Sequence, residues 1–381
     1  MTMPWKLARQ TARDAVKPLE ATEAVLSDAL GLALASGVRA LTDQPTCDTS
    51  AMDGYAVTGT GPWRITGRVA AGDPVPGVVL RSGEAFGVAT GAPVPDGSDL
   101  VVPVELCSTD GKVLHVVDER RPAPPGRHIR RRGEDWPAGS ELVPAGSPIT
   151  PAVLGLAAGA GHDTLLAHRR PRVAVIVTGD ELLHTGLPHP GRVRDALGPM
   201  LPGLLTRADL LGTTHLRDDP SALTGALASG QADVLVTCGA TSAGPADHLR
   251  RVLAGLGAEI RISGVACRPG HPMLLAVLPD GRCVVGLPGN PFAALAAVVT
   301  LLHPLLDALG GHAARPPVTA WLPDVGAHRA DTRLVPVTRS GGLAAPVGHD
   351  RPGSLWGAAL AGALAVVPPG HRGGEVEVLT F

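Results

Sequence analysis

The stretch Val173-Ala174-Val175-Ile176-Val177, followed directly by Thr178-Gly179-Asp180-Glu181, is the part of the sequence that decides the fold. A continuous run of β-branched and small apolar residues is typical of a strand that is covered on both faces. Two later runs have the same character, Val234-Leu235-Val236-Thr237 and Cys283-Val284-Val285-Gly286. We therefore expect three buried strands that lie in one sheet.

Helical segments are expected after each of these strands, one within 195–211, one at 245–256 and one at 291–309. Regular alternation of strand and helix predicts an open, mainly parallel α/β domain, which we place at residues 171–312. Ligands of such domains bind beyond the carboxyl ends of the strands. The turns at those ends are therefore the first places to look for function.

The flanking sequence is mostly β-like. Residues 1–170 predict a helix-bearing lobe, with a helix between Thr22 and Gly37 and a β-lobe inserted at about 47–135. Residues 313–381 predict a small C-terminal β-domain. The expected strands are short apolar runs between turn residues, at 64–69, 85–88, 100–104, 113–117, 334–337 and 376–379.

The composition excludes several classes of partner. Lys and Arg number 33 against 35 Asp and Glu, so the charge balance does not favour a nucleic acid. Basic residues gather at 127–132 and 169–172; a solvated loop is the favoured interpretation of both, and the first could also meet a phosphorylated small molecule. Apolar runs such as 295–302 are shorter than a membrane span, and the N-terminus lacks the apolar block of a signal peptide. We expect a cytoplasmic protein that contacts no membrane.

The metal-binding residue types show no pattern of their own. The five cysteines have no close pairs, and the fourteen histidines show no His-x-x-x-His or Cys/His spacing. The sequence therefore predicts neither a disulfide framework nor a zinc site. Any metal should be a hard ion with oxygen ligands, such as Mg²⁺.

Three turns could meet in one crevice of the α/β domain. In the first, Gly179 permits a tight exit from the strand, and Asp180 and Glu181 could meet Mg²⁺ or a polarised hydroxyl. On this tetrapeptide alone, an exposed acidic turn that only caps the next element is the favoured interpretation. The third turn contains the rigid pair Pro288-Gly289. After this pair, Asn290 is a suitable N-cap and Pro291 is a suitable first residue of the next helix.

The second turn, Cys238 to Asp247, is rich in small residues. Gly239, Ser242 and Gly244 would let backbone and a hydroxyl approach a phosphate, because helix N-termini present free N–H groups to anions. Asp247 could complement the helix dipole or contact a metal or pterin. Three glycine-rich helix entrances in one domain favour a phosphate-bearing ligand.

Several ordered motifs resemble those of the MoeA family and the related E domain of gephyrin. The most specific is Asp48-Thr49-Ser50-Ala51-Met52-Asp53-Gly54-Tyr55-Ala56-Val57, and the match runs from about residue 18 to the C-terminus. The other motifs are Thr90-Gly91-Ala92-Pro93, Arg132-Gly133-Glu134-Asp135, Thr178-Gly179-Asp180-Glu181-Leu182, Arg217-Asp218-Asp219-Pro220, Arg268-Pro269-Gly270-His271-Pro272, Leu287-Pro288-Gly289-Asn290-Pro291 and Gly353-Ser354-Leu355.

The resemblance implies a four-part architecture: a helix-bearing lobe, an inserted β-lobe, an α/β pterin-binding domain and a C-terminal β-barrel. It implies a molybdopterin molybdenumtransferase, which takes adenylylated molybdopterin and molybdate, uses Mg²⁺ and releases AMP. It also implies an elongated homodimer whose α/β cleft faces the partner subunit, and transient contact with other proteins of molybdenum cofactor assembly.

The same resemblance assigns roles by motif position. The residues matched to activity are Asp53, Thr90, Asp135, Glu181, Asp218 and Asp247, of which Glu181, Asp218 and Asp247 would hold the metal. The residues matched to substrate binding are Thr178, Gly179, Asp180, Gly239, Ser242, Gly244, Arg268, His271, Pro288, Gly289, Asn290 and Pro291.

The chain departs from the family pattern at polar positions of the α/β domain. Ala240 and Pro245 replace a glycine and a carboxylate, respectively. In the family's Asp-Ser/Thr-Asn motif, Leu197 stands in the place of the asparagine. Gly264 stands where a lysine is usual. His271 replaces the second lysine of a Lys-Pro-Gly-Lys-Pro motif. A second hypothesis is therefore an impaired paralogue that binds molybdopterin or the finished cofactor without turnover; a scaffold for partner peptides has little support.

Overall fold

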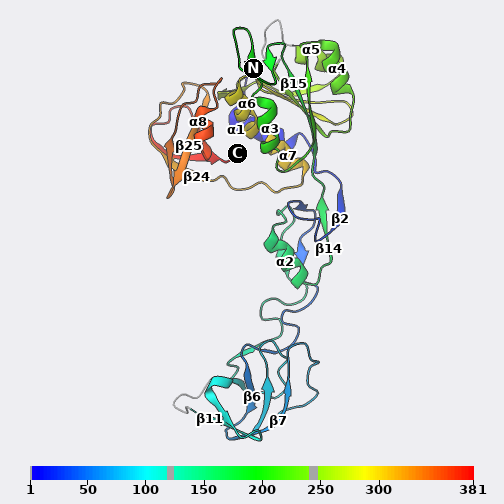
Figure 1. Ribbon diagram of the computed structural model, residues 1–381, viewed down its shortest axis with the longest axis vertical. Helices are drawn as coiled ribbons and strands as arrows, with labels where there is room; N and C mark the ends of the chain where they lie inside the picture. The colour runs from blue at the N-terminus through cyan, green and yellow to red at the C-terminus, as the bar shows by residue number, and fades with distance from the viewer. Residues whose placement is uncertain (1, 118–123, 240–247) are drawn as a thin grey trace.

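A computed structural model describes residues 2–117, 124–239 and 248–381 and shows an elongated molecule (Figure 1). The α/β domain and the C-terminal domain lie side by side at one end. A small lobe follows, and the inserted β-lobe occupies the opposite end. The predicted fold class, with an α/β domain, an inserted β-lobe and a C-terminal barrel, is confirmed.

The α/β domain is a six-stranded sheet in the order β18-β15-β19-β23-β22-β20. β15 (Arg172–Thr178) pairs in parallel with β18 (Asp209–Leu216) and β19 (Val234–Cys238), and β19 pairs in parallel with β23 (Cys283–Leu287). β22 (Leu274–Val277) pairs with β23 in antiparallel orientation, and β20 (Glu259–Ser263) pairs with β22 in the same way and completes the sheet. The three predicted strands are thus adjacent, and every residue of β19 and β23 is buried.

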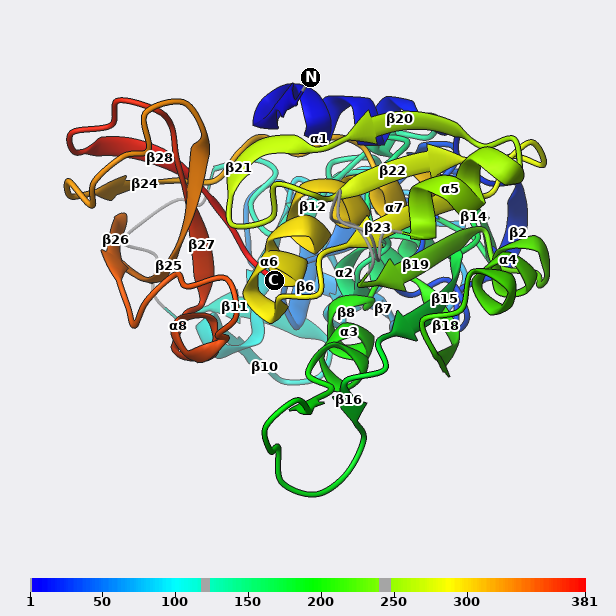
Figure 2. The same ribbon diagram turned by 90° about the horizontal axis from the view of Figure 1, so that it is seen from above.

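Helices cover both faces of this sheet (Figure 2). α3 (Leu197–Leu204) and α5 (His248–Gly255) fall within predicted helical segments. The sequence analysis missed α4 (Pro220–Ala228), which begins where Asp219 accepts a hydrogen bond from the Ser221 N–H at 2.8 Å. A short parallel pair, β16 (Leu182–Leu183) and β17 (Val193–Arg194), projects from the domain.

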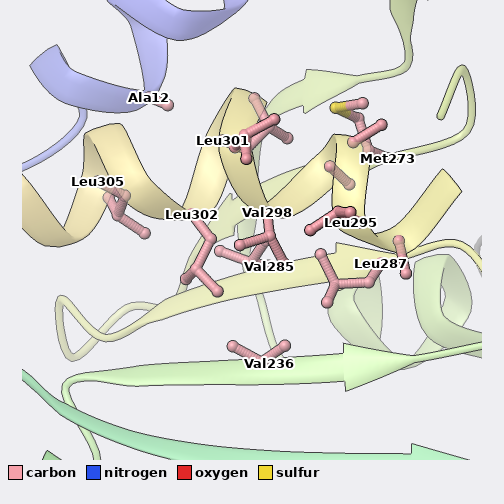
Figure 3. Close-up of a cluster of buried hydrophobic side chains, with 14 of the residues drawn as sticks. Ala12, Val236, Met273, Val285, Leu287, Leu295, Val298, Leu301, Leu302 and Leu305 are labelled. Atoms are coloured by element: carbon pink, nitrogen blue, oxygen red, sulfur yellow. The ribbon is translucent and has the colours of Figure 1, made fainter. Parts of the chain in front are cut away.

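The predicted helix at 291–309 is continuous: α6 (Pro291–Ala297) leads through a π-helical turn, η2 (Val298–Leu302), into α7 (His303–Leu309). Figure 3 shows Leu295, Val298 and Leu302 over Val285 of β23. The apolar run 295–302 is part of this longer apolar helix, and among the described residues it alone could cross a membrane by length and composition. Its most apolar window is 89% buried within the fold, so it is the core helix of the domain.

The N-terminal helix α1 (Trp5–Asp14) packs on the far side of that core helix. Trp5, Ala8 and Ala12 are buried there, and the Trp5 indole Nε1 donates to Thr300 Oγ1 at 3.0 Å. Just before α1, β1 (Met3–Pro4) pairs in parallel with β21 (Val265–Arg268). The first residues of the chain therefore lie against the α/β domain and not in the neighbouring lobe.

The small lobe contains β2 (Ala21–Val25), β3 (Ala33–Leu34) and β14 (Thr164–His168), with α2 (Pro151–Gly159) beside them. The helix predicted between Thr22 and Gly37 is wrong. All five residues of β2 pair with β14 in antiparallel, and Gly31 at φ +80° turns the chain. Because sheet pairing satisfies the backbone here, tertiary context overrides a helix-like spacing of apolar residues.

The inserted β-lobe is a six-stranded sheet in the order β10-β11-β7-β8-β6-β9. All four strands predicted within this lobe are confirmed. The strands are β6 (Gly54–Thr58), β7 (Trp63–Val69), β8 (Glu84–Val88), β9 (Leu100–Pro103), β10 (Cys107–Thr109) and β11 (Val113–Val116), with a 3-10 turn η1 (Val104–Leu106). Two short pairs, β4 (Val38–Arg39) with β13 (Glu141–Val143) and β5 (Thr49–Ser50) with β12 (Ile129–Arg130), join this lobe to the small one.

The C-terminal domain is a closed barrel, because β25 (Thr332–Ser340) pairs with both β26 (Leu343–Pro346) and β27 (Ala363–Val367). β24 (Thr319–Leu322) and β28 (Gly374–Leu379) complete it, with α8 (Trp356–Leu360) at its side. Both strands predicted here are confirmed. β21 of the α/β domain extends the barrel by pairing with β25, which ties the two domains together.

Replacing Leu302 by Ala tests the core helix. Leu302 is fully buried, so Leu302→Ala should lower the free energy of unfolding by about 2–5 kcal/mol through lost burial and a residual cavity. Leu187→Ala is the control, because Leu187 is 87% exposed and its removal should change stability little. Urea unfolding followed by circular dichroism measures both; equal stability of the two variants would contradict this packing.

Candidate functional site

The carboxyl ends of β15, β19 and β23 meet, as the sequence predicted. Thr178 Oγ1 donates a hydrogen bond to the Cys238 carbonyl at 3.1 Å, and the Gly239 N–H donates to the Leu287 carbonyl at 3.1 Å. One side-chain and one backbone hydrogen bond therefore hold the ends of the three strands against one another.

Gly239 is required by this close approach. Its φ is +97°, and a Cβ added there would lie 3.0 Å from both the carbonyl oxygen and the Oγ1 of Thr178. A Cβ at Gly289 would lie 3.8 Å from the Gly239 Cα, which is ordinary contact. Glycines at both turns thus leave an open floor at the junction of the three strands, where backbone groups can approach a ligand.

The acidic turn after β15 is braced by the end of β18. Arg217 Nε donates to Asp180 Oδ1 at 3.0 Å, and the Asp180 N–H donates to Asp218 Oδ2 at 3.2 Å. The hydrogen bond from Arg217 holds the pKa of Asp180 below its ordinary value. Asp180 is therefore an ion-pair partner of Arg217, while Glu181 and Asp218 present exposed carboxylates at the same edge.

The second turn lies largely outside the described residues. Ser242, Gly244 and Asp247, with the departures Ala240 and Pro245, fall in 240–247. Only Gly239, at the start of this turn, is placed by the structure. The contribution of that segment to the site stays a prediction.

A cavity of about 580 Å³ opens beside the third turn, between the α/β domain and the C-terminal barrel. From the α/β domain it is lined by predicted binding residues: Arg268, His271, Pro288, Gly289 and Asn290. From the barrel it is lined by His328, Arg333 and Asp350, among others. The sequence pattern did not predict these barrel residues, because they are far in sequence from the α/β domain. They lie beside it only after the barrel segment around Gly353 folds back onto that domain.

The cations of this cavity are already positioned by carboxylates. Arg268 Nε donates to Asp331 Oδ2 at 2.9 Å, and Arg333 donates through Nε to Asp350. Arg333 also donates to the carbonyls of Val325 and Gly326. These contacts fix the two guanidinium groups at the cavity wall, where they can receive an oxyanion without first being ordered.

The entrance of the core helix does not act as a free anion site. Asn290 occupies the N-cap position but its side chain makes no capping hydrogen bond. The N–H groups of Phe292 and Ala293 donate instead to the Pro352 carbonyl, at 2.9 and 3.3 Å. A barrel loop therefore satisfies these two donors, so neither of them is free for a ligand.

Two departures from the family pattern have local explanations. Gly264 has φ +109°, a conformation that a lysine at this position would adopt only with strain. In Asp195-Ala196-Leu197, the Asp195 Oδ1 accepts from the N–H groups of Leu197 and Gly198 at 2.9 Å each and caps α3. The turn thus remains ordered although the usual hydroxyl and amide are missing.

In the inserted lobe, Asp53 and Thr90 form a pair. Asp53 Oδ1 accepts from the Thr90 N–H at 2.7 Å and from Thr90 Oγ1 at 3.1 Å, and both residues are exposed. The adjacent glycine explains the motif, since a Cβ at Gly54 would lie 2.1 Å from the Val102 carbonyl oxygen. Asp53 directly precedes β6, and within one chain the lobe that contains β6 lies at the opposite end of the molecule from the α/β domain (Figure 1).

Asp135 and the neighbouring arginines join the two N-terminal lobes. Arg130, Arg131 and Arg132 form ion pairs with Asp135, Asp48 and Asp43, respectively. Hydrogen bonds from the Ala138 N–H and from Arg132 lower the pKa of Asp43. This arrangement supports the solvated-loop interpretation of the basic cluster, because its arginines are engaged within the chain.

A larger cavity of about 670 Å³ lies elsewhere, between α1, α7 and the end of the chain at Phe381. Three of its arginines are already engaged: Arg9 with the Val299 carbonyl, Arg13 with the His312 carbonyl and Arg207 with Asp307. None of the predicted site residues lines it. We therefore place the candidate site at the strand ends and the adjoining 580 Å³ cavity.

An open α/β domain with glycines where its strand ends meet, an attached barrel and an inserted β-lobe defines the class of multi-domain molybdopterin-binding proteins. Residues 3–161 match the MoeA N-terminal region (domain I and II), and residues 174–308 match a probable molybdopterin binding domain. The chain belongs to the MoeA family.

Relatives and solved structures agree. The chain is 35% identical to a molybdopterin molybdenumtransferase of Synechococcus elongatus, over 76% of this chain and 75% of that protein. It is 37% identical to molybdopterin molybdenumtransferase 2 of Mycobacterium tuberculosis, over 74% of this chain and 73% of that protein. A MoeA structure from Pyrococcus horikoshii, at 27% identity, covers 100% of this chain and 99% of its own with a TM-score of 0.79.

Replacing Gly239 by Ala tests the close approach of the turns. The added methyl group meets Thr178, and φ +97° is strained for alanine, so Gly239→Ala should lower the melting temperature and weaken molybdopterin binding together. Gly155→Ala is the control, because an added Cβ at this position in α2 meets nothing within 4 Å. Differential scanning calorimetry and pterin fluorescence titration measure both effects. Unchanged binding in Gly239→Ala would show that the junction is not part of the ligand site.

Proposed function

We propose that this protein is a molybdopterin molybdenumtransferase, which inserts molybdate into adenylylated molybdopterin and releases AMP. The observation that carries the proposal is the junction of the ends of β15, β19 and β23, together with the cavity beside the last of these ends, whose lining includes Gly289, Arg268 and Arg333. The junction would hold the pterin and its phosphates, and the cavity would receive the molybdate oxyanion. Relatives named for this activity support the assignment.

Carboxylates at the edge of the junction fit a magnesium ion. Asp218 receives one hydrogen bond from the Asp180 N–H, which leaves carboxylate oxygen free, and Glu181 is exposed beside it. We propose that Glu181 and Asp218 hold Mg²⁺ together with Asp247, which lies outside the described residues, because this ion prefers oxygen ligands. The ion would neutralise the pyrophosphate that the reaction cleaves.

The inserted lobe would act from a second subunit. Asp53 and Thr90 cannot reach the junction of their own chain, since the small lobe separates them from it (Figure 1). A twofold-symmetric homodimer would bring the lobe of one chain to the α/β domain of the other. The hydrogen-bonded Asp53–Thr90 pair would then be presented, preorganised, to the bound substrate.

The proposed cellular location and partner proteins follow from this function. A biosynthetic enzyme of this kind would work in the cytoplasm and pass its product on, so we propose transient contacts with other proteins of molybdenum cofactor assembly.

A reconstituted reaction tests the transferase. With adenylylated molybdopterin, molybdate and Mg²⁺, the wild type should release AMP, and Asp53→Ala should lose at least about 100-fold in rate if Asp53 stabilises the transition state. Asp96→Ala, an exposed aspartate of the same lobe, should retain the wild-type rate. No AMP release by the wild type above the Asp53→Ala level would exclude the transferase.

The same assay decides the second hypothesis, an impaired paralogue that binds pterin or cofactor without turnover. The rewritten turns, with Leu197 and Gly264 among the described residues, favour it. It requires tight pterin binding that Asp53→Ala leaves unchanged, with no AMP release. Binding and release measured on one preparation therefore separate the two hypotheses.

Replacing Arg268 tests the oxyanion cavity. A charge-assisted hydrogen bond contributes about 1.5–3 kcal/mol, so Arg268→Ala should raise the KM for molybdate about 10- to 100-fold. The KM for the pterin nucleotide should change less. Arg339→Ala is the control, because Arg339 is an exposed arginine of the barrel strand β25, which pairs with β21. Equal effects on both KM values would place Arg268 away from the oxyanion.

A further inference from the structure

Two histidines and an aspartate meet at the outer edge of the α/β sheet. His184 follows β16, Asp195 follows β17, and His215 lies near the end of β18. Their possible ligand atoms, one from each residue, all lie within 4.8 Å of one another. The sequence analysis expected no transition-metal site because the histidines are far apart in sequence, and only the pairing of β16 with β17 beside β18 brings them together.

The aspartate at the centre of this group is firmly held. Its side chain is only 6% exposed, and its Oδ1 accepts the two N–H bonds that cap α3. The Asp195 N–H donates to the Leu183 carbonyl at 3.0 Å, which fixes it to β16. A Cβ at Gly198 would lie 2.3 Å from Asp195 Oδ2, so a glycine keeps the space around that oxygen open. Oδ2 therefore packs against Gly198 and faces His215.

Both imidazoles face this oxygen from the solvent side. His215 Nε2 lies 2.9 Å from Asp195 Oδ2, and the rings of His184 and His215 meet edge to face with centroids 4.1 Å apart. A His–Asp hydrogen bond explains His215 and Asp195 as structure. It does not explain why the exposed His184 is held against the same pair.

We propose that His184, Asp195 and His215 bind a divalent transition-metal ion of the zinc class. Imidazole nitrogen with one carboxylate oxygen is a donor set that such ions prefer and Mg²⁺ does not. Two ligand atoms of a tetrahedral zinc ion, each about 2.1 Å from it, lie about 3.4 Å apart. The ligand atoms here all lie within 4.8 Å of one another, so rotation of the two exposed histidine side chains would bring them to a shared ion, with water in the remaining positions.

The site differs from the proposed magnesium site in chemistry and in residues. Glu181 and Asp218 offer oxygen alone, whereas this group offers two nitrogens. The ion would tie the segment between β16 and β17 to the edge strand β18.

Metal titration of the full chain, without a histidine tag and after treatment with a chelator, tests the proposal. Zn²⁺ titrated against a fluorescent competitor should bind one equivalent per chain, and Co²⁺ should give visible d–d absorption. Loss of an outer-shell partner alone costs about 10–100-fold in metal affinity, so His184→Ala and His215→Ala, which remove direct ligands, should each lose at least as much. A millimolar excess of Mg²⁺ should not displace the Zn²⁺.

His189→Ala is the matched control, because His189 is exposed on the same loop and its Nδ1 contacts only the adjacent Pro190 carbonyl. It should bind Zn²⁺ as the wild type does. Asp195→Asn should also lose affinity, and its amide oxygen can still cap α3, so metal-free melting temperatures near that of the wild type show an intact fold. The proposal is overturned if the wild type binds no equivalent of Zn²⁺, or if His184→Ala and His215→Ala bind it unchanged.

Discussion

The packing of the helix at 291–309 between the parallel sheet and α1 is the constraint on which the rest of the structure depends. Its side chains are almost entirely buried, with Leu295, Val298 and Leu302 over β23 and Ala12 of α1 on the other side (Figure 3). Burial of this many apolar side chains fixes the register of the helix on the sheet. The turn Pro288–Gly289, which connects β23 to the helix, is therefore held at both ends.

That rigid turn determines the shape of the site. The first N–H groups of the helix bond to the Pro352 carbonyl, and β21 pairs with β25, so the barrel is attached to the α/β domain at two places. The cavity with Arg268 and Arg333 lies between those attachments. An unsatisfied helix terminus is costly when buried, and here the barrel loop that satisfies it also lines the cavity that we propose for the oxyanion.

Local pattern predicted the buried strands and their turns, because a strand covered on both faces leaves an unmistakable apolar run. It failed at Thr22 to Gly37, where pairing with β14 decides the structure, and at α4, whose start at Asp219-Pro220 was interpreted only as a motif. Motif resemblance located Asp53, Glu181, Asp218 and Arg268. It did not identify Arg333, which is far in sequence from the other residues that line the cavity. It also did not identify the group of His184, Asp195 and His215, because these three residues are far apart in sequence.

The central claim is that one reaction site combines the α/β domain of one subunit with the inserted lobe of another. Mixed dimers of an Asp53→Ala chain and a Glu181→Ala chain test it most directly. Each homodimer should be inactive, whereas the purified heterodimer keeps one intact site and should release AMP at about half the wild-type rate. A heterodimer as inactive as its parents would contradict the shared site.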